Sequence, residues 1–240
     1  MIYLVGVERR MKMFRQKDFK LHMYMCMIGG FIGTYTLIRC SGHFGAAQTT
    51  NLIHAVESLV HLDVKEFLLC AGGFLAYMFG AQSYVLVTRK TSWNPQKWAL
   101  IMEAIFLAVM GFIPADASFY FCLYPAFYIL AAQWSAFHGT DSYNSSTIFS
   151  SNNVKQFSLA LGECMCDRKN VKQAEKAKFF GLTLLSYHMG VGAAYICCRS
   201  QQAASIWWCY LLLGLAVWNV FGPIRKPVVS GQAVYRHRGA

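Results

Sequence analysis

The chain has 240 residues, of which 56% are hydrophobic and 14% are charged, and its formal net charge is +11. A soluble protein normally carries about 25% charged residues, so this composition excludes an ordinary soluble domain and indicates a membrane protein. A net charge of +11 would be compatible with a nucleic-acid partner, but the distribution of the basic residues argues against one. They are divided among the segments that separate long apolar runs.

Six apolar runs are long enough to cross a bilayer, which takes roughly 20 mostly apolar residues. The predicted spans are residues 21–39, 66–88, 97–114, 117–137, 178–198 and 204–222. Only Pro114, Ala115 and Asp116 separate the third span from the fourth, so the turn between them must be tight. The prediction is an all-α polytopic membrane protein with six transmembrane helices. A single membrane domain, 21–224, lies between a basic N-terminal segment, 1–20, and a basic tail, 225–240.

The positions of the basic residues predict the orientation of these spans. Of the 22 Lys and Arg residues, 19 fall in the N-terminal segment, after the second and fourth spans, and in the tail. The other side holds only Arg39, Lys65 and Arg199. Because Lys and Arg accumulate on the cytoplasmic side of membrane proteins, both termini are expected to be cytoplasmic. Residues 8–20 are expected to form either an amphipathic surface helix or a disordered tail.

A short polar motif occurs at two corresponding points of the chain. It reads Gln-Thr-Thr-Asn at 48–51, after the first span, and Ser-Ser-Asn at 150–152, after the fourth. Two further spans follow each copy, which divides the chain into two repeats of three spans, 21–114 and 117–222. Because three is an odd number, the repeats would cross the membrane in opposite directions. Inverted repeats with a polar break are an indication of a transport site.

The repeat extends beyond the motif. Aligning Asn51 with Asn152 gives an offset of 101 residues and pairs the first span with the fourth. In the next span the offset is 110, so the second repeat has a connection nine residues longer. The identical positions in that span are Leu75, Tyr77 and Gly80 in the first repeat and Leu185, Tyr187 and Gly190 in the second.

The segment after each motif is predicted to be a short helix, over residues 51–60 and 152–161. Hydroxyl side chains favour helix starts, so Thr49 or Thr50 and Ser150 or Ser151 are expected to cap these helices. If the helices enter the bilayer, their starts meet near its middle and present unpaired N–H groups to a solute. The alternative is that both helices lie on the membrane surface and that the motif residues only cap them.

Residues in and after the first span resemble a family of bacterial membrane proteins. Residues 29–35, Gly-Gly-Phe-Ile-Gly-Thr-Tyr, precede Phe44 and the run 47–51, Ala-Gln-Thr-Thr-Asn. This order is similar to the YoaK-type family, whose function is largely unknown, and the resemblance covers about residues 20–224. It implies a bacterial inner-membrane location. Gly33 stands where the family has an acidic residue, so a mechanism that needs that carboxylate does not carry over. Thr50 and Ser151 stand where the family has glycine.

Two titratable residues inside predicted spans are further candidates. Glu103 lies in the third span, where an acid is a functional candidate by default; the alternative is an interfacial acid or a partner of Lys97. His188, in the fifth span, either faces a cavity or bonds a backbone carbonyl. The expected substrate-binding residues are Gln48, Thr49, Thr50, Asn51, Ser150, Ser151, Asn152, Glu103 and His188.

The predicted function is a transporter or channel for a small polar or anionic solute, with its site at the interface of the two repeats. One rival is a structural or regulatory membrane subunit, which would have a dry repeat interface. A weaker rival is an intramembrane enzyme, which would bring Glu103, His188 and the motifs within hydrogen-bonding distance. No enzyme motif stands out, and no metal or cofactor is expected. The expected partners are the lipid bilayer and a small solute, and a homo-oligomer is left open.

Overall fold

The structure is a computed structural model that describes residues 2–140 and 142–222. It is about 81% helical, so the fold is all-α, as predicted. The tail predicted at 225–240 lies outside the described residues. The elements in chain order are α1 (Ile2–Arg39), α2 (Gln48–Val60), α3 (Val64–Lys90), α4 (Pro95–Phe112), α5 (Phe119–Ala136), β1 (Gly139–Thr140), β2 (Tyr143–Asn144), α6 (Ser151–Cys166), α7 (Val171–Gln201), the 3-10 helix η1 (Gln202–Trp208) and α8 (Cys209–Phe221).

Local sequence explains where two of the long helices begin. α3 follows Asp63, whose side chain accepts a hydrogen bond from the Glu66 backbone N–H. α4 follows Asn94, which accepts one from the Lys97 backbone N–H, and Pro95 is its first residue. Asp and Asn satisfy the unpaired N–H groups of a helix start, and proline fits at the first position because it has no N–H to pair. Both helices therefore start at residues suited to that position.

Five helical segments are long and apolar enough to cross a membrane. They are Lys17–Arg39 within α1, α3, α4, α7 and the segment Ala204–Phe221, which ends with α8. The predicted span at 117–137 forms α5, which is not among these five. Pro125, Gln133 and the tyrosines of α5 lower its hydropathy, but most of its surface is covered by protein.

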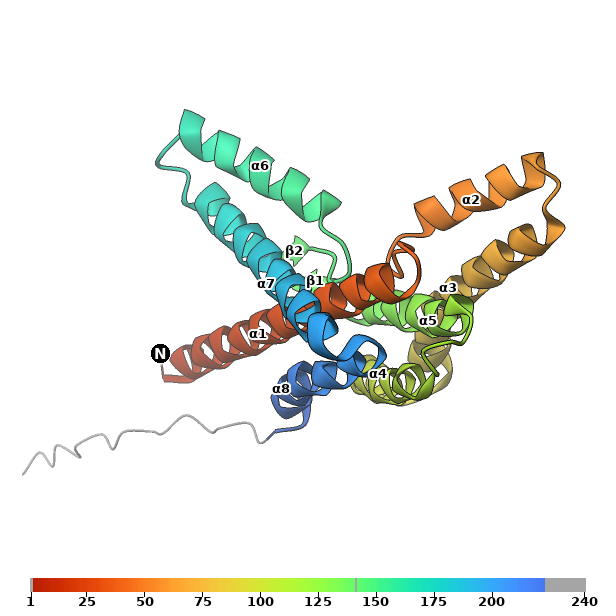
Figure 1. The fold of residues 1–240 in the computed structure, drawn as a ribbon. Coiled ribbons are helices and arrows are strands. Elements are labelled where there is room, and N and C mark those ends of the chain that lie inside the picture. The colour runs from red at the N-terminus through yellow and green to blue at the C-terminus, as the bar shows by residue number, and fades with distance from the viewer. Residues whose placement is uncertain (1, 141, 223–240) are drawn as a thin grey trace, which may run out of the picture.

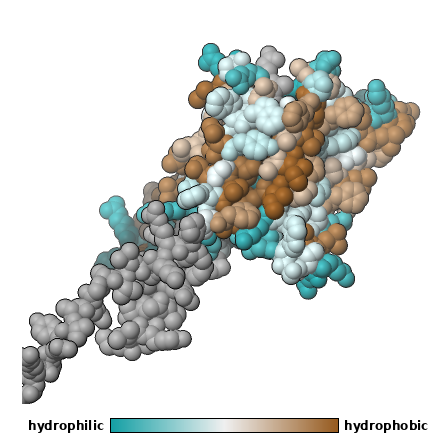
Figure 2. Space-filling view, turned by 90° about the horizontal axis from the view of Figure 1, so that it is seen from below, coloured by the Kyte–Doolittle hydropathy of each residue, from teal (hydrophilic) through white to brown (hydrophobic). Residues whose placement is uncertain are grey.

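α1 and α5 form the interior of the bundle. In the apolar part of α1, 72% of the residues are buried, compared with between 17% and 33% in the other four segments. The outer helices expose large apolar side chains, such as Phe79 on α3 and Ile196 on α7. Figure 2 shows apolar residues over the middle of one face and hydrophilic residues along its margins. Soluble proteins rarely expose so much apolar surface, so this arrangement is that of a multi-pass membrane protein.

The long helices pack in a crossed pattern. α1 lies against α7, and α5 lies against α3. α2 packs on α3 and α6 on α7, while α4 packs on α5 and α8 on α1. Glycine permits the two central crossings, because a Cβ on Gly190 would lie 1.9 Å from the Met27 carbonyl oxygen and one on Gly80 would lie 2.1 Å from that of Tyr128. A larger residue at either glycine would push the helices apart.

α2–α3 and α6–α7 are helical hairpins that extend away from the interior helices. In Figure 1, α2 and α6 begin near the centre of the molecule and run outward in different directions, each beside the helix that follows it. α2 has a row of exposed apolar residues, including Ile53, Val56 and Val60, the last of which is 74% exposed. In a membrane, lipid chains would cover this apolar face.

Two further features position the site described below. α1 is a single helix from Ile2, so residues 2–20 are a helical continuation of the first span rather than a disordered segment. β1 and β2 form a two-stranded antiparallel hairpin in the connection between α5 and α6. This connection folds back over α1, where a Cβ on Gly29 would lie 2.1 Å from the Thr147 carbonyl oxygen.

Candidate functional site

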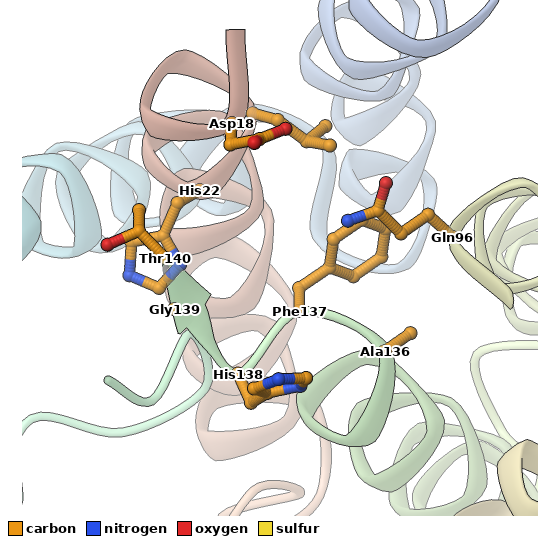
Figure 3. Close-up of a pocket in the computed structure, with 9 residues that line it drawn as sticks. Asp18, His22, Gln96, Ala136, Phe137, His138, Gly139 and Thr140 are labelled. Atoms are coloured by element: carbon orange, nitrogen blue, oxygen red, sulfur yellow. The ribbon is translucent and has the colours of Figure 1, made fainter. Parts of the chain in front are cut away.

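A cavity of about 350 Å³ lies where α1, the start of α4 and the end of α5 meet (Figure 3). It is lined by Asp18, Leu21, His22, Gln96, Ala136, Phe137, His138, Gly139 and Thr140. In Figure 3, His22 and Thr140 lie on one side of the hollow and Gln96 lies on the opposite side. The lining supplies a carboxylate, which accepts hydrogen bonds, and imidazoles, an amide and a hydroxyl, which both donate and accept them. The volume is near the lower end of the usual range for ligand pockets, so the cavity suits a small polar molecule.

His22 is the most enclosed polar residue of this lining, at 2% exposed. Its Nε2 lies 3.1 Å from the Ser145 hydroxyl, and its ring stacks on Phe179 with centroids 5.5 Å apart. Its Nδ1 has no hydrogen-bond partner among the described residues. A buried polar atom without a partner costs about 1–3 kcal/mol. His22 lines the cavity and has an unused hydrogen-bonding atom, which protein atoms enclose in this structure, so the residue is a candidate for contact with a bound solute.

A second cavity of about 230 Å³ adjoins the first and shares Asp18 and Thr140 with it. Its lining is Asp18, Phe19, Thr140, Ser142, Tyr143, Glu175, Lys178, Phe179 and Leu182. The ring centroid of Phe179 lies 6.0 Å from that of Phe19 and 5.0 Å from that of Tyr143. Burial and the nearby Glu175 carboxylate raise the pKa of Tyr143, so its phenol is neutral at physiological pH.

The first motif holds one buried amide. Asn51 is 3% exposed, and its Nδ2 donates to the Gln48 side-chain oxygen at 3.1 Å and to the Cys70 carbonyl oxygen of α3 at 2.9 Å. Gln48 is half-buried, whereas Thr49 and Thr50 are exposed. Asn51 therefore joins α2 to α3, and both N–H groups of its amide bond within the protein.

In the second motif the buried amide is Asn153, at 1% exposed, and its neighbour Asn152 is exposed. Asn153 Nδ2 donates to the Ser146 carbonyl oxygen at 2.8 Å, and its Oδ1 accepts from the Ser145 hydroxyl at 2.9 Å. The same Ser145 hydroxyl faces His22. Asn153 thus holds the connection before α6 and reaches the wall of the first cavity through one intermediate side chain.

The expected helix caps are wrong for α2, and in α6 Ser150 holds the expected N-cap position without a side-chain cap bond. α2 begins at Gln48, after Ala47, so Thr49 and Thr50 lie inside its first turn rather than before it. Ser150 does precede α6, but it makes no side-chain cap bond and its hydroxyl has no partner among the described residues. Ser151 is the first residue of α6 and is exposed. The helix of the first motif thus starts earlier than predicted, and its buried residue Asn51 bonds to α3 instead of capping.

Glu103 and His188 lie apart from both cavities. Glu103 is 1% exposed within α4, and neither carboxyl oxygen has a partner among the described residues. Lys97 does not pair with it, since the Lys97 ammonium lies over the Phe221 ring, 5.0 Å from its centroid. His188 is exposed on α7, with its Nδ1 2.8 Å from the Leu184 carbonyl oxygen. The hydrogen-bonded cluster that an intramembrane enzyme would require is absent from the described residues.

The nine expected site residues line neither of the two cavities. The sequence interpretation missed His22, although a histidine at the start of an apolar span is itself a signal. Thr140 carried no signal, because it reaches the cavity only through the folding of residues 137–149 over α1. Gln96 carried none either, because it reaches the cavity only through the packing of α4 on α5. In the described part of the chain, no group of three His, Cys, Asp or Glu residues is placed to hold a metal ion.

Comparisons with known proteins bear on the identity of the chain. Searches of curated proteins and of solved structures gave no match. Residues 21–218 match the family described as "Protein of unknown function (DUF1275)". The match begins with the first predicted span and ends within α8, so it covers most of the chain, and it agrees with the resemblance to the YoaK-type family. The chain therefore belongs to the DUF1275 family.

Proposed function

We propose that this protein is a transporter or channel of the bacterial cytoplasmic membrane that carries a small polar solute through the cavity beside His22. The main support for the proposal is that both halves of the chain contribute residues to the wall of this cavity. The first half of the chain supplies Leu21, His22 and Gln96, and the second half supplies residues 136–140. Transporters built from two repeats hold their solutes at the interface between the repeats. A purely structural subunit needs no polar cavity there.

The packing of the helices supports the proposed inverted repeat. Met27 and Tyr128 are equivalent at the offset of 101, and Gly80 and Gly190 are equivalent at the offset of 110. Gly190 approaches the Met27 carbonyl, and Gly80 approaches the Tyr128 carbonyl. The two central crossings are therefore counterparts of each other. The packing of α2 on α3 and α4 on α5 has its counterparts in α6 on α7 and α8 on α1. In this proposal α5 is the sixth span.

Among the described residues, the lining of the first cavity contains the carboxylate of Asp18 and neither Lys nor Arg. Its other polar groups are an amide, a hydroxyl and two imidazoles, so the lining suits a small polar solute. In the orientation proposed from the basic residues, the cavity lies at the cytoplasmic end of the bundle. The motif residues then have a supporting part, because Asn51 holds the α2–α3 hairpin and Asn153 holds the connection that carries Ser145 to His22.

Thiol labelling tests transport without knowledge of the solute. Thr140→Cys would be made in a background in which the cysteines that are not buried, Cys164, Cys166 and Cys197, are serine. Right-side-out and inside-out vesicles would then be treated with a membrane-impermeant maleimide. A transporter or channel exposes its cavity to both sides, so labelling from both sides is expected.

The matched control is Asn144→Cys, which lies on the same hairpin but is exposed and lines neither cavity. It should react from the cytoplasmic side alone. If Thr140→Cys behaved in the same way as this control, the protein would be a one-sided binding or structural protein and the proposed function would be wrong.

A further inference from the structure

Glu103 lies near the middle of α4, on the face that turns toward the interior of the bundle. Ala99, Leu100, Leu107 and Met110 share this face at helical spacing, and each of them is at most 3% exposed. Glu103 itself is 1% exposed, and neither of its carboxyl oxygens has a hydrogen-bond partner in the described part of the chain. A charged carboxylate in such surroundings costs far more free energy than the neutral acid.

Among the described residues, α8 and α4 supply no charged partner that would offset this cost. α8 brings the Cys209 thiol near the carboxyl group, and its Tyr210 hydroxyl donates to the Ala104 carbonyl oxygen. Lys97, on α4 itself, lies over the Phe221 ring. The sequence of η1, which also packs on α4, contains no titratable residue.

The other two helices packed against α4 have titratable groups with different surroundings. The phenols of Tyr120 and Tyr124 on α5 donate to α3, and the ring of Tyr128 stacks on a phenylalanine of α4. The thiol of α5 interacts with the residue that follows α1. The basic residues in the last turn of α3, Arg89 and Lys90, are exposed. The carboxyl group of α4 is therefore kept as the neutral acid, which means that it holds a proton.

The second repeat fills the equivalent position with an apolar residue. At the offset of 110, Glu103 of α4 corresponds to Leu213 of α8, and Trp98 corresponds to Trp208. Leu213 is 3% exposed, so it is buried in the same way. An apolar side chain avoids the desolvation cost of an acid, so packing alone gives no reason for a carboxyl group here. An acid inside a span is then a functional candidate.

Glu103 is two helical turns deeper in the bundle than the first cavity. Gln96, which lines that cavity, is seven residues before Glu103 on the same helix, and residues seven apart share a helix face. At 1.5 Å per residue, the separation along α4 is about 10 Å. The buried side chains of Ala99 and Leu100 lie between them along the helix. A proton on Glu103 is thus close to the cavity but separated from it by an apolar layer.

We propose that Glu103 is an exchangeable proton-binding site of the membrane bundle, separate from the two cavities. A metal ion would need further ligands, and no group of three His, Cys, Asp or Glu residues in the described structure is placed to supply them. The inference does not rest on the proposed function, because a subunit that carries no solute could also hold this proton. In a transporter, the proton on Glu103 would be the coupling ion.

The pH dependence of stability tests whether the folded protein holds the proton. Unfolding of the wild type and of Glu103→Gln would be compared by denaturant titration in detergent between about pH 5 and pH 8. An unfolded chain releases the proton of a glutamic acid near about pH 4.3, so in this range the wild type loses one proton on unfolding and becomes less stable as the pH rises. The ratio of its unfolding constant to that of Glu103→Gln should rise about tenfold per pH unit. A ratio that does not change with pH would overturn the inference.

Two further variants serve as controls. Glu163→Gln changes an exposed glutamate of α6, so the ratio of the wild type to this variant should not depend on pH. Glu103→Leu copies Leu213 and should show the same pH-dependent ratio as Glu103→Gln, which keeps the comparison possible if the glutamine variant does not fold.

A hydrophobic carbodiimide tests whether the proton can be exchanged. Dicyclohexylcarbodiimide reacts with a protonated carboxyl group: the carboxyl oxygen bonds to the central carbon of the reagent, and the proton moves to its nitrogen. Mass spectrometry of peptides from treated membranes should locate the label at Glu103, and labelling should decrease as the pH rises. If Glu103 stayed unlabelled at every pH, its proton would be permanently enclosed and the proposal of an exchanging site would be wrong.

The proton site and the proposed transport fail separately. A pH-dependent stability ratio with one-sided labelling of Thr140→Cys would keep the proton site and remove transport. Two-sided labelling of Thr140→Cys with a constant ratio would keep the transporter and remove the proton site.

Discussion

α2 and α6, the helices that follow the connections after α1 and α5, each have a buried asparagine near their start, but the two side chains have different partners. Asn51 donates across a helical hairpin to the Cys70 carbonyl oxygen. Asn153 bonds to Ser146 and Ser145 in the connection before α6, and Ser145 leads to His22. What the two regions share is therefore a buried amide satisfied by protein groups. The hydrogen-bond partners, and the link to the cavity, differ.

Replacing either buried amide by a carboxylate should have the largest effect on stability. Asn51→Asp would place an oxygen against the Cys70 carbonyl, and Asn153→Asp would place one against the Ser146 carbonyl. Each should lower the free energy of unfolding by about 4 kcal/mol, because a buried charge loses its solvation and faces an acceptor. Denaturant titration in detergent would measure this. Asn152→Asp is the exposed control, and an equally mild Asn51→Asp would show that the bond to the Cys70 carbonyl oxygen adds little to stability.

Alanine substitutions would separate the two regions. Asn153→Ala leaves groups of Ser145 and Ser146 without their partner and should cost about 3 kcal/mol. Asn51→Ala removes the bonds to Gln48 and to the Cys70 carbonyl oxygen, which keeps its helical partner within α3, and should cost about 1.5 kcal/mol. The same denaturant titration would give the difference. Equal losses of stability would mean that the extra hydrogen bonds of Asn153 add nothing. The two asparagines would then contribute to stability only through their burial.

The link from the second region to the cavity can be measured by a double-mutant cycle. His22→Ala, Ser145→Ala and the double variant should show a coupling of about 1 kcal/mol, because the two side chains share one hydrogen bond. A cycle between Ser145→Ala and His188→Ala should show none. Coupling of similar size in both cycles would indicate a general loss of packing rather than a specific link.

The smallest effect is expected at the hydroxyl residues of the first motif. Thr49 and Thr50 are exposed inside the first turn of α2. Their replacement by alanine should change the free energy of unfolding by less than about 0.5 kcal/mol, since alanine also favours a helix. A loss of about 1 kcal/mol, which is typical of a removed cap, would show that one of them caps the helix in solution.

Most of the fold could be predicted from the sequence, because apolar runs of membrane length are visible without any tertiary information. The boundaries of α3 and α4 lie within two residues of the predicted spans. α5 was predicted too, as residues 117–137, although its tyrosines and Gln133 leave it outside the five segments of high hydropathy. The Gln133 amide donates to the Met25 carbonyl oxygen of α1 and to Thr147, so this polar group is satisfied inside the bundle.

The candidate site was harder to predict, for two physical reasons. Asn152 and Asn153 are adjacent, and only the path of the chain before α6 decides which amide points inward. His22 and Ser145 are 123 positions apart, so their pairing depends on a connection folding over α1. A single sequence shows which residues each helix or strand contains. It does not show which distant side chains a folded loop will bring into contact.

The unbroken length of α1 has a mechanical consequence. At 1.5 Å per residue, its 38 residues extend for about 57 Å, while the hydrocarbon core of a bilayer is about 30 Å thick. The surplus is at the end that carries Arg9, Arg10 and Lys12, and it is rigidly joined to the turns that carry Asp18 and His22. Attraction of this basic arm to an anionic membrane surface would tilt the whole rod. The basic turns and one wall of the cavity therefore belong to the same helix, and any tilt of that helix would move both.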